Sequence, residues 1–290
     1  MKRIALVTGG TSGIGKETVR GLARAGLAVV LVGRDQRKCA EVVQELRADT
    51  GQTDITALTA DLSRLEDIRR VADEFRATYP RLDVLVNNVG AIFDTRRTTP
   101  DGLEQTFALN HISYFLLTNL LLDRLLASAP ARVVNVSSAA HRFVPGVDFD
   151  DLQFERKPYA PMTAYGQSKL MNILFSQELA RRLEGTGVTS NSLHPGGVAS
   201  NFADNTTGWF RLTAKVLKWA VGISPARGAE TSVYLATSDE VAGVSGRYFE
   251  RCRAATTSAA AMDPTAQVRL WQVSEQVVGQ VFPSPAGVTS

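Results

Sequence analysis

The chain has 290 residues, of which 44% are hydrophobic and 21% charged, and its formal net charge at pH 7 is +3. This length allows one large domain or two small ones, and the hydrophobic share is ample for a core. The Lys and Arg residues are scattered, which excludes a basic tract of the kind that binds nucleic acid or anionic lipid. No apolar run reaches the length of about 18 residues that a spanning helix needs, so we expect no membrane span.

Cysteine and histidine usage argues against disulfide and metal chemistry. Neither Cys39 nor Cys252 has metal-ligand spacing around it, and a count of two cysteines argues against a disulfide framework. His111, His141 and His194 form no pair with ligand spacing either. We therefore expect no metal and a reduced, cytoplasmic setting. The chain begins MKRIALVTGG, whose apolar part is too short for a signal peptide.

Short apolar strands alternate with helical segments along the chain. Strands are predicted at 4–8, 28–32, 54–60, 82–88, 132–138, 188–196 and 246–250. Helices are predicted at 14–25, 35–49, 63–78, 101–128, 163–184, 225–237 and 264–279, the last with Asp263 as its N-cap and Pro264 as its first residue. Strands of this kind belong in a parallel sheet covered on both faces. The predicted fold is α/β: a doubly wound, seven-stranded, mostly parallel Rossmann-type sheet with helices on both faces, in a single domain over 1–290.

The segment 199–224 breaks this alternation. It follows the carboxyl end of a predicted strand, where open α/β sheets bind ligands. We predict an apolar substrate lid, although core packing or a subunit interface would also explain its large apolar residues. These residues are Phe202, Trp209, Phe210, Leu212 and Trp219.

The first predicted strand ends in TGGTSGIG (8–15), which carries glycines at positions 9, 13 and 15. Glycines allow a tight turn and a close approach of the backbone to a ligand. The helix that follows points its free N–H groups and its positive end at that ligand. An ordinary strand-to-helix turn is the alternative, but this arrangement favours a site for the pyrophosphate of a dinucleotide.

The end of the second strand, VGRD, bears on the choice between NAD and NADP(H). Gly33 takes the last strand position, and Arg34 after it suits the 2′-phosphate of NADP(H), which a guanidinium holds through two parallel hydrogen bonds. Asp35 lies at the spacing expected of a carboxylate that binds the ribose of NAD. We favour NADP(H) through Arg34, with Asp35 as the N-cap of the next helix.

Tyr165 and Lys169 stand four residues apart in MTAYGQSKLMNILFSQELA (162–180), so they share one side of an otherwise apolar helix. Taken alone, the spacing fits a pair of surface residues at the start of that helix. A pair that transfers protons is the other interpretation, and the local pattern does not choose between them.

Several motifs occur together in the order seen in the short-chain dehydrogenase/reductase family. They are TGGTSGIG, Asp61-Leu62, NNVG (87–90), Asn110, Ser138, YGQSK (165–169) and HPGGV (194–198). The chain resembles this family from residue 4 to about residue 250. Within it, the chain is most similar to the retinol dehydrogenase branch, through SSAAHRF (137–143), the insert before Tyr165, SPARGAETSVYLA (224–236), GRYFE (246–250) and RLWQVSE (269–275).

The resemblance implies roles for individual residues. Tyr165 would be the general acid/base, and Lys169 would favour its phenolate and bind the nicotinamide ribose. Ser138, with Ser137 as the competing choice, would hold the substrate oxygen, and Asn110 would hold a water that relays protons to Lys169. The implied cofactor contacts are Gly9, Thr11, Ser12, Gly13, Ile14, Gly15, Arg34, Asp61, Leu62, Asn87, Tyr165, Lys169, Val198 and Ser200.

Two of these residues also have simpler explanations. Asp61 could cap the next helix instead of contacting adenine, although Ser63 is better placed for that capping role. Asn110 could simply cap or kink its helix. His141 could touch the substrate, but packing of its loop is the more ordinary role.

The predicted function is hydride transfer between NADP(H) and the carbonyl or alcohol group of a hydrophobic small molecule. Cellular NADP(H) is usually kept reduced, so we expect a carbonyl reductase. The alternatives are an NAD-linked alcohol dehydrogenase and a non-catalytic dinucleotide-sensing protein on the same fold. The family also suggests a homo-oligomer through the helices at 101–128 and 163–184.

Overall fold

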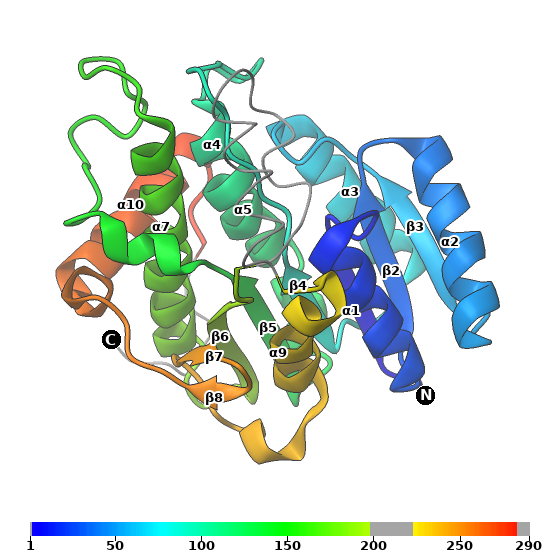
Figure 1. The fold of residues 1–290 in the computed structure, drawn as a ribbon. Helices are drawn as coiled ribbons and strands as arrows, with labels where there is room; N and C mark the ends of the chain where they lie inside the picture. Colours follow the sequence, from blue (N-terminus) through cyan, green and yellow to red (C-terminus); the bar gives the residue numbers. More distant parts are fainter. Residues whose placement is uncertain (1, 198–222, 283–290) are drawn as a thin grey trace.

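The computed structural model describes residues 2–197 and 223–282, and these contain one eight-stranded sheet (Figure 1). The strand order is β3-β2-β1-β4-β5-β6-β7-β8, so the chain winds outward in both directions from β1. Neighbouring strands from β3 to β7 are parallel, as predicted. The strands are β1 (Ile4–Thr8), β2 (Ala28–Gly33), β3 (Ile55–Thr59), β4 (Val84–Asn87), β5 (Ala131–Val136), β6 (Val188–His194), β7 (Tyr248–Glu250) and β8 (Arg253–Ala254).

The eighth strand is the one departure from the predicted sheet. β8 has two residues and pairs antiparallel with β7. Arg251 and Cys252 form the turn between them with positive φ values of 50° and 59°. A two-residue strand after a tight turn carries no hydrophobic period, so the sequence pattern could not predict it.

Helices cover both faces of the sheet (Figure 1). The alternation of side chains along β1 shows which helices pack on each face. Ala5 and Val7 pack in a cluster with residues of α1 (Gly13–Arg24), α2 (Gln36–Thr50) and α9 (Pro225–Thr237). Leu6 points the other way, into a cluster with residues of α3 (Leu65–Thr78), α5 (Ser113–Leu120), α7 (Pro161–Arg182) and α10 (Pro264–Val278). The two cores of a three-layer α/β fold follow from this alternation.

The helix predicted over 101–128 is broken in the structure. It consists of α4 (Gln105–Phe107), a π-helical turn (Ala108–Ile112), α5 and α6 (Leu122–Leu126). Its start is delayed to residue 105 because Glu104 acts as the N-cap, accepting hydrogen bonds from the N–H groups of Thr106 and Phe107. The π turn contains Asn110, and such turns are frequent at functional sites.

The predicted helix caps are confirmed in two cases and wrong in one. Asp35 accepts a hydrogen bond from Lys38 N at 3.0 Å, and Asp263 accepts one from Thr265 N at 2.9 Å. Ser63 does not cap α3; its N–H and Oγ both donate to Asp61 Oδ1. The orphan N–H of Leu65 is instead satisfied from a distant loop, by Asp101 Oδ2 at 2.9 Å.

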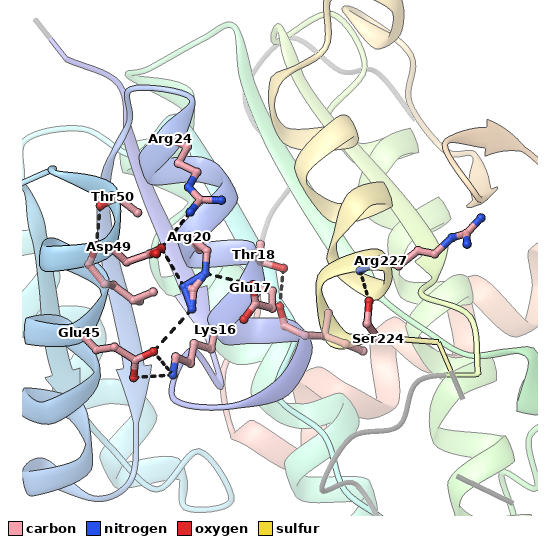
Figure 2. A network of polar contacts seen from close by, with 12 residues as sticks. Lys16, Glu17, Thr18, Arg20, Arg24, Glu45, Asp49, Thr50, Ser224 and Arg227 are labelled. Carbon is pink, nitrogen blue, oxygen red and sulfur yellow. Dashed lines mark hydrogen bonds and ion pairs between the residues drawn. The ribbon is translucent and has the colours of Figure 1, made fainter. Parts of the chain in front are cut away.

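Ion pairs join α1 to α2 on the outer surface (Figure 2). Arg20 stands at the centre, with its guanidinium 3.1 Å from Glu17 and 3.2 Å from Asp49. Lys16 and Arg24 add pairs to Glu45 and Asp49. The network therefore joins α1, which begins at the glycine turn, to the second half of α2.

Two further expectations concern the predicted lid and the absence of a membrane span. The predicted lid, 199–224, lies outside the described residues except for its last two, and so do Val198 and Ser200. Over 2–197 and 223–282, the helices are all too short or too polar to cross a lipid bilayer.

Candidate active site

A cavity of about 700 Å³ opens at the carboxyl ends of the central strands. This is the edge where open parallel sheets bind ligands, because the chain turns to opposite faces on either side of it. Its walls come from the segments after six strands, β1 to β6, and from the start of α7. They include the glycine turn, Asn88–Ala91, Ser137–Ala140, His194–Gly197, Tyr165 and Lys169.

The glycine turn has the geometry that an anion site requires. Gly9 and Gly13 adopt positive φ values of 68° and 54°. A Cβ on Gly15 would lie 2.2 Å from the carbonyl oxygen of Gly9, so only glycine permits this packing. Ser12, the N-cap of α1, makes no side-chain capping bond, which leaves the first N–H groups of the helix available to a phosphate.

The turn is joined to the end of β4 by Thr8. Its Oγ1 accepts hydrogen bonds from the N–H of Asn88 at 2.8 Å and of Val89 at 3.1 Å, and Asn88 Nδ2 donates to Thr8 O at 2.8 Å. Asn88 therefore lines the cavity. Asn87, the residue proposed from the sequence, does not: its buried Nδ2 donates to Thr118 and Asn135, because consecutive side chains of a strand point to opposite faces.

The far end of the cavity carries two exposed cations, Arg34 and Lys38. Neither side chain has a hydrogen-bond or ion-pair partner among the described residues. Lys38 was missed by the sequence reasoning, although it stands four residues after Arg34, in the first turns of α2. Asp35 does not line the cavity, since its carboxylate caps α2. Asp61 and Leu62 complete this end.

Ser138, Tyr165 and Lys169 come together in the cavity wall. The side chain of Ser138, just after β5, forms a hydrogen bond with the Tyr165 phenol. Lys169 Nζ lies 5.7 Å from the centroid of the Tyr165 ring. Ser137 also reaches the cavity, but its Oγ donates to the backbone oxygen of Lys169 at 2.6 Å. Ser138 is thus the serine that contacts the tyrosine.

Burial moves the pKa values of Tyr165 and Lys169 in opposite directions. The side chains are 8% and 3% exposed, and loss of water penalises the charged form of each. The pKa of Tyr165 is raised well above its ordinary value by burial, and the Ser138 hydrogen bond opposes this only in part. Burial lowers the pKa of Lys169 to about 7. Burial is therefore the largest influence on both pKa values, and stabilisation of the phenolate by Lys169 stays a prediction.

Lys169 is anchored by a hydrogen bond to the backbone oxygen of Val136. Lys169 Nζ donates to it at 3.0 Å, and Asn172 Nδ2 does so at 3.3 Å. The hydroxyl of Tyr114 lies 3.3 Å from the same oxygen, and its ring lies 5.6 Å from Lys169 Nζ. Tyr114 is fully buried on α5, and no local sequence signal placed it beside the site.

Asn110 lies behind the wall and does not line the cavity. Its Oδ1 accepts from Ala91 N, and its Nδ2 donates to Ala91 O and Ser168 Oγ, at 2.9, 2.9 and 3.0 Å. Gly90 separates it from Lys169: a Cβ there would lie 3.2 Å from Lys169 Nζ and 3.3 Å from Asn110 Oδ1. Asn110 thus fixes the loop after β4 next to Lys169.

Apolar side chains surround the end of the cavity that holds Ser138, Tyr165 and Lys169, which we call the catalytic end. They are Val89, Phe93, Leu109, Ala140, Phe143 and Met162. Phe143 and Met162 are 77% and 44% exposed, on the turn after Ser138 and one helical turn before Tyr165. Large apolar residues so exposed at the mouth of a cavity favour an apolar ligand.

Comparisons with known proteins agree with this geometry. Residues 3–149 match the family described as short chain dehydrogenase. Human retinol dehydrogenase 13 is 41% identical over 287 residues, covering 97% of this chain and 86% of its own. A solved structure of an uncharacterized protein from Mycobacterium paratuberculosis has a TM-score of 0.78 at 33% identity, covering 97% of this chain and 95% of that one. The Pseudomonas aeruginosa RhlG/NADP active-site complex has a TM-score of 0.67 at 30% identity, covering 85% and 93%.

Proposed function

Because the chain belongs to the short-chain dehydrogenase family, we propose that it uses NADPH to reduce the carbonyl group of a hydrophobic small molecule. Family membership makes it an oxidoreductase that acts on a CH–OH or C=O group with a nicotinamide dinucleotide. The preference for NADP(H), the direction and the class of substrate are the proposal.

The hydrogen bond between Ser138 and Tyr165 beside Lys169 carries this proposal. The nicotinamide, when bound, supplies the hydride. A phenol with a raised pKa is protonated at neutral pH, so Tyr165 is ready to give its proton to the oxygen of a carbonyl substrate. Ser138 Oγ can hydrogen-bond the same oxygen. The ammonium form of Lys169 would then stabilise the phenolate left behind.

Arg34 and Lys38 support NADP(H) over NAD. These two cations, which have no side-chain partner in 2–197 and 223–282, line the end of the cavity opposite Tyr165 and suit a 2′-phosphate. The carboxylate of Asp35, which would favour NAD, is instead engaged as the cap of α2. The complex of the Pseudomonas relative with NADP is consistent with this preference.

The apolar wall around Ser138 and Tyr165 supports a hydrophobic substrate. The similar retinol dehydrogenases are named for an apolar alcohol of this class. Apolar pockets discriminate weakly among similar apolar shapes, so a panel of aldehydes and ketones of increasing chain length, with retinal included, is the suitable screen.

Cofactor titration tests the proposal directly. The purified protein is titrated with NADPH and with NADH, following nicotinamide fluorescence, for wild type, Arg34→Ala and Lys38→Ala. Loss of one cation from the phosphate site should raise the Kd for NADPH about tenfold, and leave that for NADH nearly unchanged. Arg37→Ala is the matched control, because Arg37 lies between them, is exposed and does not line the cavity.

Equal affinity for NADH, insensitive to Arg34 and Lys38, would favour NAD-linked oxidation of an alcohol. Tight cofactor binding without turnover of any carbonyl or alcohol in the panel would instead point to a dinucleotide-sensing protein.

A further inference from the structure

Two histidines hold opposite ends of the peptide group that follows Ser138. His141 Nδ1 lies 2.6 Å from the backbone oxygen of Ser138. His194 Nδ1 accepts a hydrogen bond from the N–H of Ala139 at 3.2 Å. That oxygen and that N–H belong to one peptide bond, so the pair fixes the orientation of its plane.

The partners of the two rings define their tautomers. A carbonyl oxygen can only accept, so His141 carries its proton on Nδ1; its Nε2 then accepts from the N–H of Ser258 at 3.4 Å. An amide N–H can only donate, so Nδ1 of His194 is bare and Nε2 carries the proton. The contact of His194 with Ala139 therefore requires a neutral imidazole, as does the contact of His141 with Ser258, whereas the donation from His141 to Ser138 persists when the ring is protonated.

Rigid elements hold both histidines. His194 is the last residue of β6 and lines the cavity. His141 is fully buried in the 3-10 turn Ala139–Phe143, where its ring meets Tyr248 of β7 edge-on at 5.2 Å. The pair thus connects the loop of Ser138 to the two strands that follow β5 in the sheet.

We propose that His141 and His194 are positioning residues that aim Ser138 at the substrate oxygen. This inference rests on the proposed function, in which Ser138 Oγ binds that oxygen. Ser138 Oγ also accepts from the N–H of Ala140 at 3.2 Å, so its direction depends on the backbone that the histidines hold. Fixing that backbone keeps the serine hydroxyl within reach of both Tyr165 and the substrate.

The arrangement makes catalysis sensitive to acid. Protonation of His194 would place an N–H opposite the N–H of Ala139, and the loop would lose its anchor to β6. Burial lowers the pKa of His194, as do Arg142, His141 and Arg251 nearby, while Glu250 of β7 opposes them. The pKa of His141 is also lowered, chiefly by burial. Both rings therefore stay neutral until the pH falls below the ordinary histidine range.

Two substitutions at His194 separate the hydrogen bond from the ring. His194→Asn can keep an acceptor, Oδ1, near the position of Nδ1 but cannot titrate; His194→Leu removes the acceptor. With NADPH and an aliphatic aldehyde, we expect kcat to fall about tenfold in the Leu variant and less than threefold in the Asn variant. The acid limb of the pH profile of kcat should move to lower pH in His194→Asn, and the Kd for NADPH should stay unchanged in both.

A further variant and a control keep the test decisive. His141→Phe retains a ring against Tyr248 and loses both hydrogen bonds, so it should also lower kcat without weakening NADPH binding. His111→Leu removes the remaining histidine, which contacts Ser274 and not the Ser138 loop, and should leave the acid limb where it is. Wild-type kcat and an unmoved acid limb in both His194 variants would overturn the inference. Absence of turnover in the wild type, with NADPH bound, would instead contradict the proposed function.

Discussion

The two ends of the cavity differ in how they use charge. At the end formed by the glycine turn and two exposed cations, Arg34 and Lys38, for which we propose phosphate binding and which we call the phosphate end, backbone N–H groups and solvated charges line the cavity. At the catalytic end, Tyr165 and Lys169 are buried, and their pKa values are shifted in opposite directions. Exposed charges are solvated and contribute modestly to stability and binding. Buried titratable groups lower the free energy of unfolding, and their shifted pKa values make them more reactive. Substitutions at the catalytic end should therefore have the larger effects, and those effects should depend on pH.

The largest effect is expected from Tyr165→Phe. Removing the phenol removes the proton donor, which should lower kcat for aldehyde reduction by about a thousandfold. The ring itself remains, so the cavity should keep its shape and the Kd for NADPH should change little. Steady-state kinetics and fluorescence titration on the same preparation measure both. If kcat is within tenfold of wild type, another group supplies the proton and the catalytic end has been misassigned.

Lys169→Met should combine a loss of activity with a change in stability. We expect kcat to fall by about a hundredfold, because no ammonium stabilises the phenolate. In the wild type, the folded protein releases the lysine proton near pH 7, whereas an unfolded lysine keeps it until about pH 10.4. The unfolded state thus binds more protons in that interval, and the free energy of unfolding should rise by up to ~1.4 kcal/mol per pH unit.

The Met variant lacks this group, so its free energy of unfolding should rise less steeply from about pH 7.5 to 9.5. Urea denaturation of both proteins across this interval is the measurement. If the free energies of unfolding of the two proteins rise in parallel with pH, Lys169 keeps its proton in the folded protein. Burial would then lower the pKa of Lys169 by less than we expect.

The two ends of the cavity also differ in how far the sequence predicted them. The strand at 4–8, the glycine turn and the helix at 225–237 are local features, and the structure has them where the pattern put them. Tyr165 and Lys169 share one helix, so their spacing alone placed them together. Local hydrogen-bonding chemistry sufficed for Asp35 as well, because a cap is satisfied within three residues.

Contacts between distant segments escaped the sequence. Tyr114 reaches Lys169 from another helix, and His194 reaches Ala139 across 55 positions. Ser63 was assigned a capping role that Asp101 performs from 36 positions away. The sequence reasoning named Asn87, whereas Asn88 lines the cavity, because the residue at which β4 ends decides which side chain faces it. Such choices depend on how elements pack, which a periodic pattern does not encode.

His111 offers a smaller and purely structural test of burial, away from the cavity. It lies fully buried in the π-helical turn, against Ser274 of α10, and burial lowers its pKa to about 3. Because an unfolded histidine binds a proton near pH 6.5, the wild type should lose ~1.4 kcal/mol of stability from this group for each pH unit below that value. His111→Leu lacks the group, so its free energy of unfolding should fall less between about pH 6.5 and 5. An equal fall in both proteins would mean that His111 is protonated within the fold.

The smallest effect is expected away from the cavity, from Arg20→Met. Arg20 is the centre of the ion-pair network between α1 and α2, and its side chain is 16% exposed (Figure 2). Methionine keeps much of the aliphatic stem and removes the charge, so the free energy of unfolding should fall by about 1 kcal/mol, with little dependence between pH 6 and 8. The difference should shrink in 1 M salt, where screening shortens the range of charge interactions to about 3 Å. A loss of more than about 3 kcal/mol that salt does not reduce would mean that the ion pairs behave as buried ones. The contrast between exposed and buried charge would then hold for the two ends of the cavity but not for α1 and α2.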